Sequence, residues 1–436
     1  MDWLFPFALM VGLILFFMGL GLPVAFAFFL VNIIGLFLFF GGSAGVTQMI
    51  ANFSDAIASY SLAPLPLFLI MGSLFFRSGL GDGVMHALDL CIGNLRARLS
   101  YVVLAGGAVF SALSGSSLAN TGMMGSLMVP EMLKRNYKPK MAYGPILGAG
   151  SLAVIIPPSS LGVLLGSLAN INVGALLIAG VLPGLLLTVI FALLIYVQTR
   201  IDPDCAPLYP VDDIGFAAKA KAVAINIVPM GVIIFLVVGT ILLGIATPTE
   251  SAALGCAGVF GLLFAYRRFS WASVWAALDD AMKVTAMTFL IISASTTFAQ
   301  VFAFSGASFG FISFVTGFDP GPYTFLAIMV LVILILGMFM DQVSMMLITL
   351  PIFLPIANHF GFDLVWFALI LLLAYEVGFT TPPFGLLLFV MIGVAPPGTT
   401  LKTVALAVAP YMVCTLLLIV LIIVFPSLAL FLPSLL

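Results

Sequence analysis

The stretch EVGFTTPP at residues 376–383 ends in two consecutive prolines inside an apolar segment. A second proline pair, Pro157 and Pro158, also stands inside an apolar segment, in GAGSLAVIIPPSS at residues 148–160. Helix interiors usually exclude proline, because it lacks a backbone donor and its ring clashes with the preceding turn. Pro130 and Pro355 are separated by the same number of residues as Pro157 and Pro382, so the offset between the halves is fixed. Matching prolines in two apolar halves predict matching breaks in membrane helices.

The composition places the chain in a lipid bilayer. Of its 436 residues, 63% are hydrophobic and 7% are charged, and the mean hydropathy is +1.32. Near-continuous apolar runs of about 20 residues predict an all-α polytopic membrane protein, whereas a membrane β-barrel would alternate polar and apolar residues. The net charge of −2 does not suggest a nucleic-acid partner, and the four scattered cysteines lack the spacing of a metal site.

The apolar segments divide into two repeats joined by a polar linker. The first repeat covers residues 1–198, the linker 199–221 and the second repeat 222–436. The stretches 83–97 and 270–283 are amphipathic and too short or too polar to span, so we expect them along the membrane interface. Membrane or half-membrane segments are expected near residues 4–20, 22–41, 46–60, 64–77, 99–116, 118–133, 142–156, 159–169, 173–198, 224–244, 247–266, 284–304, 322–339, 343–357, 364–381, 384–394 and 401–432.

Each repeat is expected to contain one re-entrant hairpin and one broken helix. The hairpins cover about 99–133 and 322–357, and the broken helices cover about 142–169 and 364–394. Small and polar residues at the middle of the first pair favour a hairpin tip buried in protein, because irregular backbone is not tolerated against lipid. Interrupted segments at matching positions of two halves are typical of secondary transporters and mark the binding site.

Charged residues at the hairpin mouths predict that the two repeats have opposite orientations. The mouth of the second hairpin bears Asp319 and Asp363 and neither Lys nor Arg, whereas the first mouth is basic. Basic loops are cytoplasmic as a rule, so the two mouths should face opposite sides of the membrane. The fold is therefore expected to consist of two inverted-topology repeats. The basic residues of the first mouth are Arg96, Arg98, Lys134, Arg135, Lys138 and Lys140.

The tip of the first hairpin suggests a cation site. Five of its eight residues are polar: Ser114, Ser116, Ser117, Asn120 and Thr121. Hydroxyls, an amide oxygen and freed backbone carbonyls are hard ligands that suit Na⁺. Small residues at a tight helix–helix contact are the structural alternative, but one or two serines would suffice for that. We expect Ser114, Ser117 and Asn120 to bind one Na⁺ together with the backbone at Ile156.

The second tip, residues 338–344, carries Asp341 at the repeat position of Ser116. A carboxylate at bilayer depth costs about 2.5–3.5 kcal/mol on insertion scales, so it normally faces a cavity or a partner. Cation coordination with Ser344 is one interpretation, and a hydrogen bond to an exposed helix end is the other. The proline pair also frees the carbonyls just before it, which adds Gly378 and Thr381 to the second expected cation site.

An anionic substrate is expected between the two cation sites. The half-helices that follow the proline pairs present their positive N-terminal ends there. The expected substrate contacts are Ser116, Ser159, Ser160, Thr380 and Thr381. Two further carboxylates lie near membrane segments. We expect Glu250 to belong to a helix cap that begins at Thr247, and for Glu376 both site lining and internal pairing stay open.

Four motifs in this order resemble the large membrane subunit of the tripartite ATP-independent periplasmic (TRAP) transporters. They are IPPSS at 156–160, GIATPTESAALG at 244–255, MDQVSMMLITLPIFLPI at 340–356 and EVGFTTPPFG at 376–385. The resemblance covers essentially the whole chain. It implies Na⁺-coupled import of a small organic acid across a bacterial inner membrane, with two or more Na⁺ ions. It also implies an elevator mechanism, in which a transport domain with both hairpins moves along a scaffold.

The same resemblance implies two protein partners. One is a small four-helix membrane subunit, expected on a separate chain, and the other is a periplasmic binding protein that delivers the substrate. The first Na⁺ site of the family maps onto residues 114–120 and the backbone before Pro157, and the second maps onto Asp341, Ser344 and residues 378–381.

One motif departs from the family pattern. Many members carry TPPVGLN where this chain has TPPFGLL at residues 381–387. The change replaces an amide by Leu387 and adds the aromatic ring of Phe384. If this position lines the pocket, the chain should prefer a less polar or differently shaped acid.

Three alternatives compete with this interpretation. A stand-alone Na⁺/dicarboxylate symporter of the same fold would need no binding protein and stays open. An intramembrane enzyme would use Asp341 and Glu376 as an acid–base pair, but the Gly-x-Gly-Asp motif of membrane aspartyl proteases is absent before Asp341. A channel is disfavoured by the repeat and by the lack of a charged ring or filter segment. The chain is therefore expected to be a transporter and not an enzyme.

Overall fold

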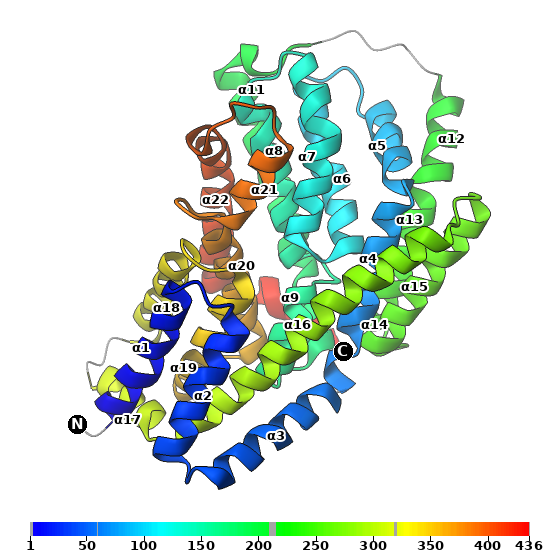
Figure 1. The fold of residues 1–436 in the computed structure, drawn as a ribbon. Coiled ribbons are helices and arrows are strands. Elements are labelled where there is room, and N and C mark those ends of the chain that lie inside the picture. The colour runs from blue at the N-terminus through cyan, green and yellow to red at the C-terminus, as the bar shows by residue number, and fades with distance from the viewer. Residues whose placement is uncertain (1–2, 59, 209–214, 318–320, 436) are drawn as a thin grey trace.

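The computed structural model describes residues 3–58, 60–208, 215–317 and 321–435 (Figure 1). Helices dominate these four ranges, and no strand occurs within them. Seven helices in the described part are long and apolar enough to cross a membrane. The expectation of an all-α polytopic membrane protein is confirmed.

The first half of the chain contains eleven α-helices among its described residues. They are α1 (Leu4–Gly19), α2 (Val24–Phe39), α3 (Ser43–Ala58), α4 (Pro64–Arg77), α5 (Leu80–Cys91), α6 (Arg98–Ser114), α7 (Ser117–Lys134), α8 (Pro139–Ser151), α9 (Ser160–Leu168), α10 (Val173–Ala179) and α11 (Val181–Ile201). Short 3₁₀ turns lie at Tyr60–Leu62, Leu152–Val154 and Pro203–Cys205.

The second half continues in the same pattern. Its helices are α12 (Phe216–Asn226), α13 (Val228–Ile234), α14 (Thr240–Leu242), α15 (Pro248–Ala265), α16 (Trp271–Phe304), α17 (Ala307–Thr316), α18 (Pro322–Gly337), α19 (Gln342–His359), α20 (Leu364–Thr380), α21 (Leu386–Val394), α22 (Leu401–Val424) and α23 (Ser427–Leu430). A π-helical turn at Phe235–Gly239 joins α13 to α14, and a 3₁₀ turn covers Pro433–Leu435.

Helix boundaries around the proline pairs agree between the halves. Helix α7 begins at Ser117 and α19 begins at Gln342, and this offset is the one that separates the two proline pairs. Each is preceded by a helix (α6 or α18) and followed by one that ends before a proline pair (α8 with its 3₁₀ turn, or α20). A half-helix, α9 or α21, then follows each pair. The two proline-interrupted regions therefore have the same order of elements.

The start of α15 confirms the expected helix cap. Thr247 Oγ1 accepts a hydrogen bond from the backbone of Glu250 (3.3 Å), and the Glu250 carboxylate accepts one from the backbone of Thr247 (2.8 Å). Pro248 occupies the first helical position, where its missing N–H is of no consequence. This reciprocal capping box gives Glu250 a structural role.

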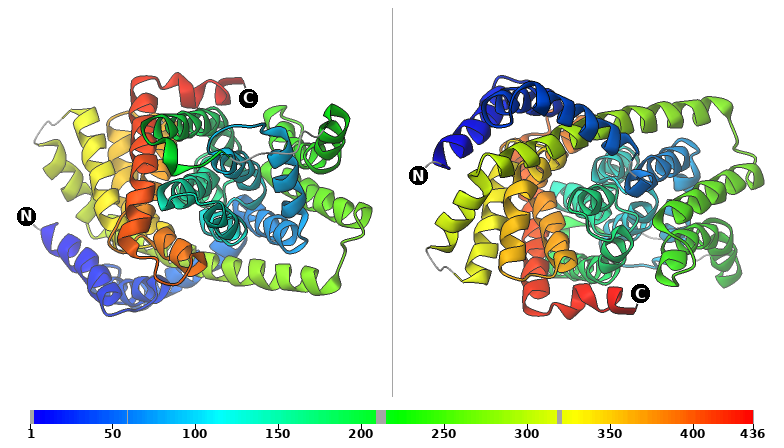
Figure 2. Two further views of the ribbon diagram at one scale, coloured as in Figure 1. Left: turned by 90° about the horizontal axis from the view of Figure 1, so that it is seen from above. Right: turned by 90° about the horizontal axis from the view of Figure 1, so that it is seen from below.

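The region before the second hairpin differs from the sequence-based expectation. Residues 270–283 and 284–304 were expected as separate segments, but both belong to the 34-residue helix α16. No Gly or Pro interrupts Trp271–Phe304, so nothing in the sequence ends the helix where its amphipathic part gives way to apolar residues. Helix α16 crosses the front of the molecule in Figure 1 and runs along one edge in Figure 2.

Three more features of the helix order were not expected. The segment 173–198 divides into α10 and α11 at Gly180, where a Cβ atom would lie 2.0 Å from the carbonyl oxygen of Ile155. Helix α17 was not expected at all, and α12 begins inside the stretch expected to be a polar linker. Residues 209–214 of the expected linker and Asp319 of the second hairpin mouth lie outside the described residues.

The proline-interrupted helices form the centre of the molecule. Every residue of α8 from Met141 to Ser151 is buried, and so is every residue of α20 from Trp366 to Thr380. A helix that is buried on all sides has no amphipathic pattern. The sequences of α8 and α20 agree with this, because they are apolar on every face apart from glycine and a few polar residues. Helix α7 packs against α8 and against α21 from the other half, while α4 and α2 pack against α16 at the periphery.

Candidate functional site

The first hairpin tip lies directly on the first proline break. Gly115, between α6 and α7, has φ = +59° and its carbonyl accepts a hydrogen bond from the backbone of Ser160 (3.2 Å). A Cβ atom at Gly115 would lie 2.4 Å from the carbonyl oxygen of Pro158. Both the backbone conformation and the close approach therefore require glycine here.

We expect Gly115→Ala to destabilise the protein by about 1–3 kcal/mol, because a methyl group would strain the left-handed backbone and push the tip off the break. Thermal unfolding in detergent measures this loss. Gly93→Ala is the matched control, because no atom lies within 4 Å of a Cβ at Gly93. Equal melting temperatures for the two variants would contradict the close docking.

The second tip docks on the second break in a comparable way. The backbone of Phe384 donates to the carbonyl of Met338 (3.2 Å), and a Cβ atom at Gly337 would lie 2.4 Å from the backbone of Gly378. The ring of Phe384 packs against Phe339, with centroids 6.0 Å apart. Leu387, at the other position that departs from the family motif, is fully buried. The extra aromatic ring thus contacts the second tip.

Ser116 and Asp341 cap the helices that follow the tips. Ser116 Oγ accepts a hydrogen bond from the backbone of Ala119 (3.4 Å) at the start of α7. Asp341 Oδ1 accepts from the backbones of Val343 (3.0 Å) and Ser344 (3.1 Å), and the Ser344 hydroxyl donates to the other carboxylate oxygen. The helix-end interpretation of Asp341 therefore holds in this structure. These capping hydrogen bonds leave lone pairs of the Asp341 carboxylate free to bind a cation.

Both tips reach one buried carboxylate, that of Glu376. Ser117 Oγ donates to Glu376 Oε2 (2.8 Å), and Gln342 Nε2 donates to the same oxygen. Ser117 and Gln342 occupy equivalent positions in the two halves of the chain, since each begins its helix. Glu376 is 1% exposed. Oε2 of Glu376 is therefore paired internally, whereas Oε1 is buried without a hydrogen-bond partner among the described residues.

Several buried oxygens at the first tip lack a hydrogen-bond partner. Asn120 Nδ2 donates to Ser111 Oγ (2.9 Å) and lies close to the carbonyls of Gly107 (3.1 Å) and Ala149 (3.2 Å), but Asn120 Oδ1 has no partner among the described residues. Thr121 Oγ1 and Ser160 Oγ are buried and unpartnered in the same sense. A set of unsatisfied hard oxygens is the donor set that a monovalent cation prefers.

The remaining expected site residues are engaged with the backbone of the breaks. Ser159 is buried and its hydroxyl oxygen accepts a hydrogen bond from Gly162 N (3.0 Å) at the start of α9. Thr380 and Thr381 donate to the carbonyls of Glu376 and Val377, each at 2.7 Å. The backbone N–H of Ile156 donates to Leu152 (2.8 Å), and the carbonyl of Gly378 accepts from Thr381 (2.9 Å). Hydroxyl and carbonyl oxygens in such bonds keep a free lone pair.

A cavity of about 360 Å³ opens beside the first tip. It is lined by Ser114 and Ser116 of the tip and by Arg77 of α4 and Asp280 of α16. Arg77 and Asp280 form an ion pair of 2.6 Å, and Ser73 donates to the same Asp280 oxygen (2.9 Å). Neither Arg77 nor Asp280 was predicted from the sequence as a site residue. The available signal was Arg77 as the one charged residue of α4 and Asp280 within the charged, amphipathic first part of α16, which alone does not place them together.

Of the expected substrate contacts, the structure brings only Ser116 to this cavity. Ser159 and Thr380 are buried away from it, and Ser160 and Thr381 are not among the residues that line it. Glu376, Thr380 and Tyr411 instead line a small internal cavity of about 10 Å³. The described cavity is therefore a vestibule at the first tip, not a closed pocket between both breaks.

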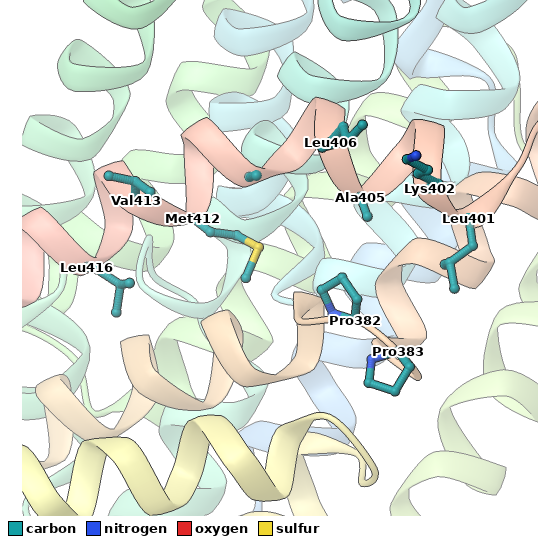
Figure 3. Close-up of a pocket in the computed structure, with 10 residues that line it drawn as sticks. Pro382, Pro383, Leu401, Lys402, Ala405, Leu406, Met412, Val413 and Leu416 are labelled. Carbon is teal, nitrogen blue, oxygen red and sulfur yellow. The ribbon is translucent and has the colours of Figure 1, made fainter.

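A further cavity of about 590 Å³ lies between the second proline pair and α22 (Figure 3). Pro382 and Pro383 face α22 in Figure 3, with Lys402 at one end. Apart from Lys402 the side chains that line it are apolar. It therefore offers one charge and no hydroxyl for recognising a carboxylate.

Comparisons with known proteins agree on one family. Residues 11–428 match the family model described as "Tripartite ATP-independent periplasmic transporter, DctM component". The C4-dicarboxylate TRAP transporter large permease protein DctM of Pseudomonas aeruginosa is 32% identical and is covered over 86% of each chain. The ectoine TRAP transporter large permease protein TeaC of Halomonas elongata is 28% identical over 98% of each.

A solved structure gives independent information on the fold. The YdaH transporter of Alcanivorax borkumensis superposes with a TM-score of 0.58 over 89% of this chain and 87% of that chain. The two sequences are 15% identical, so the likeness is one of fold.

Proposed function

This chain belongs to the DctM component family of the tripartite ATP-independent periplasmic transporters, and from that premise we propose that it imports a small organic acid across the bacterial inner membrane together with Na⁺. Membership confirms the sequence-based expectations of a membrane-embedded transporter and not an enzyme. Relatives named for C4-dicarboxylates and for ectoine support a small organic acid as the substrate class.

The observation that carries Na⁺ coupling is the group of unpartnered oxygens at the first tip. Asn120 Oδ1, Thr121 Oγ1 and Ser160 Oγ are buried without a hydrogen-bond partner in the described structure. Each such atom lowers the free energy of unfolding by about 1–3 kcal/mol, because it has lost its hydrogen bonds to water and has gained none in the protein. A Na⁺ ion bound by Asn120, with Ser114, Ser117 and the carbonyl of Ile156, would offset part of this cost.

A second Na⁺ ion is assigned to Asp341, Ser344, Gly378 and Thr381. The approach of Gly337 to Gly378 brings the end of α18 against the backbone just before the second break. The carboxylate of Asp341 supplies a negatively charged ligand, and the hydroxyl and carbonyl oxygens complete an all-oxygen donor set. Two bound cations would hold both tips on their breaks and would favour an anion between them.

The acid is proposed to enter through the cavity that holds Arg77 and Ser116. Arg77 is the only cationic side chain among the described residues that line it. A guanidinium recognises a carboxylate through two parallel hydrogen bonds. In the present structure Asp280 occupies that position, so the substrate carboxylate would replace Asp280 on Arg77. Ser159, Ser160, Thr380 and Thr381 would become contacts only after the tips separate from the breaks.

Alternating access is proposed to use the two repeats as an inverted pair. The common order of helices in the two halves, and the docking of each tip on its own break, support this arrangement. The hairpins with α8, α9, α20 and α21 would form the transport domain, and α2, α4, α15 and α16 the scaffold. The first hairpin would open to the cytoplasm, because its mouth is basic.

Two partners complete the proposed system. The words "tripartite" and "large permease" in the family and relative names support a small membrane subunit and a periplasmic binding protein that delivers the acid. A stand-alone symporter of the same fold, which would need neither partner, is the second candidate.

Uptake into proteoliposomes with an imposed Na⁺ gradient tests the proposal. Radiolabelled C4-dicarboxylates and ectoine are offered to the chain alone and to the chain with its small subunit and binding protein. Uptake only in the complete mixture, lost when K⁺ replaces Na⁺, is the expected result. Uptake by the chain alone would establish the stand-alone symporter, and uptake indifferent to Na⁺ would refute the coupling.

A further inference from the structure

A cavity of about 690 Å³ lies where the first hairpin opens, and its lining is basic and aromatic. Arg96 comes from the loop between α5 and α6, and Tyr101 comes from α6. Tyr196, Thr199 and Arg200 come from the last turns of α11. This cavity is distinct from the site at the hairpin tips, because it shares no lining residue with the cavity that holds Arg77.

The two arginines of this cavity are not neutralised by any described carboxylate. Neither Arg96 nor Arg200 belongs to an ion pair within the described ranges. Arg200 Nε donates to the Tyr196 hydroxyl (3.1 Å), and its guanidinium carbon lies 5.1 Å from the centre of the Tyr196 ring. These contacts orient the group and leave its two terminal nitrogens for an anion.

Neighbouring charges are already paired with one another. Arg98 is bound to Asp89 (2.8 Å), and Lys138 and Lys140 are bound to Asp202 (2.9 and 2.8 Å). Hydrogen bonds from Lys140 and Lys138 lower the pKa of Asp202 to about 2. This carboxylate therefore stays ionised and remains paired with the two lysines. Two positive charges therefore remain at the cavity without a counter-ion from the described neighbours.

The cavity lies at the end of the bundle that carries the basic mouth of the first hairpin, which we expect to be the cytoplasmic end. The backbone of Leu99 donates to the Tyr137 hydroxyl (3.3 Å), and Lys138 N donates to Cys205 O (2.9 Å). These bonds join the basic mouth of the first hairpin to the end of α11. Basic residues collect on the cytoplasmic side, and tyrosines are enriched at the level of the lipid headgroups. In this orientation Arg96 and Arg200 would lie beside the anionic cytoplasmic leaflet.

An apolar stripe on α11 continues from the cavity towards the membrane interior. Leu185, Val189, Leu193 and Val197 are spaced four residues apart, so they share one face of α11, and each is about half exposed. Tyr196 and Arg200 lie in the last turns of the same helix. A molecule with an anionic head and long apolar tails matches both features, whereas a free anion would use only the arginines.

From this combination we infer that the cavity binds the phosphate of an anionic phospholipid from the cytoplasmic leaflet, with its acyl chains along α11. Arg96 and Arg200 hold the phosphate oxygens, and Tyr101 and Tyr196 border the glycerol region. The lipid would connect the α5–α6 loop to the end of α11. This inference does not depend on the transported acid or on Na⁺.

Native mass spectrometry of the purified chain, titrated with dioleoylphosphatidylglycerol, tests it. Arg96→Gln/Arg200→Gln should weaken binding of the tightest lipid at least tenfold, because each basic residue near an anionic surface contributes about a factor of five. Arg96→Lys/Arg200→Lys should keep most of the affinity. The control Arg267→Gln/Lys221→Gln removes two exposed charges that do not line the cavity and should bind like the wild type.

Three results would overturn the inference. The first is equal phosphatidylglycerol binding by the wild type and the double glutamine variant with matching melting temperatures. The second is equally tight binding of dioleoylphosphatidylcholine, which has no net charge. The third is displacement of the lipid by millimolar inorganic phosphate, which would make the cavity a site for a soluble anion. A phosphatidylglycerol-specific loss in the glutamine variant alone supports the lipid site.

Discussion

Asp341→Asn should raise the Na⁺ concentration needed for half-maximal uptake by about 10- to 100-fold. Asparagine is as good a helix cap as aspartate, so the hydrogen bonds from Val343 N and Ser344 N survive. The variant therefore removes the charge and keeps the start of α19. Hydrogen-bonded or ionic contacts of a charged group are worth about 1.5–3 kcal/mol, which corresponds to one to two decades in affinity.

Asp363→Asn is the control for this experiment. Asp363 caps α20 with the same geometry, since it accepts from Val365 N (2.9 Å) and Trp366 N (3.0 Å), but it lies exposed at the outer end of that helix. Na⁺-dependent uptake by Asp363→Asn should match the wild type. If Asp341→Asn also matched the wild type, Asp341 would be a helix cap and nothing more, and the second Na⁺ site would have to lie elsewhere.

Substitutions at Arg77 and Asp280 should change the apparent affinity for the acid in opposite directions. Arg77→Gln should raise the acid concentration for half-maximal uptake about tenfold, because the carboxylate loses a charge-assisted partner. Asp280→Asn should lower it, because the competing carboxylate is gone and Arg77 is free to bind substrate. The measurement is the substrate dependence of uptake at saturating Na⁺.

Lys283 and Asp279 supply the matched control on the same helix. They form an exposed ion pair of 2.6 Å on α16 and do not line the cavity. Surface pairs of this kind contribute little, so Asp279→Asn and Lys283→Gln should leave the affinity for the acid unchanged. If Asp280→Asn weakened the affinity as Arg77→Gln does, the Arg77–Asp280 pair would serve to hold α4 against α16, and the vestibule would not recognise the carboxylate through Arg77.

Much of the arrangement around the breaks followed from sequence, because proline acts locally. The pairs at Pro157 and Pro382 end helices through their own missing donors and ring clashes, whatever the surroundings. The cap at Glu250 was likewise predictable, since its partner Thr247 is three residues away. Asp341 was harder. A carboxylate at a helix start is both a good cap and a good cation ligand, and only the hydrogen bonds show that capping takes place.

The role of Glu376 depended on contacts that no sequence pattern encodes. Its partners Ser117 and Gln342 come from different halves of the chain and meet only because both tips fold onto the centre. The vestibule was missed for the same reason. Arg77 and Asp280 lie in different halves of the sequence, and their pairing requires α4 to pack on α16.

The sequence by itself determined that the chain is a helical membrane protein, where its helices break and which family it resembles, because hydropathy and proline act over one helix or less. The tertiary structure alone decided that α16 is continuous past its amphipathic part, that Ser116 reaches a cavity while Ser159 does not, and that one carboxylate joins both tips. These features depend on close approach between distant segments. Gly115 is an example: its residue type indicates only a flexible position, and its left-handed backbone conformation together with packing against Pro158 makes glycine necessary there.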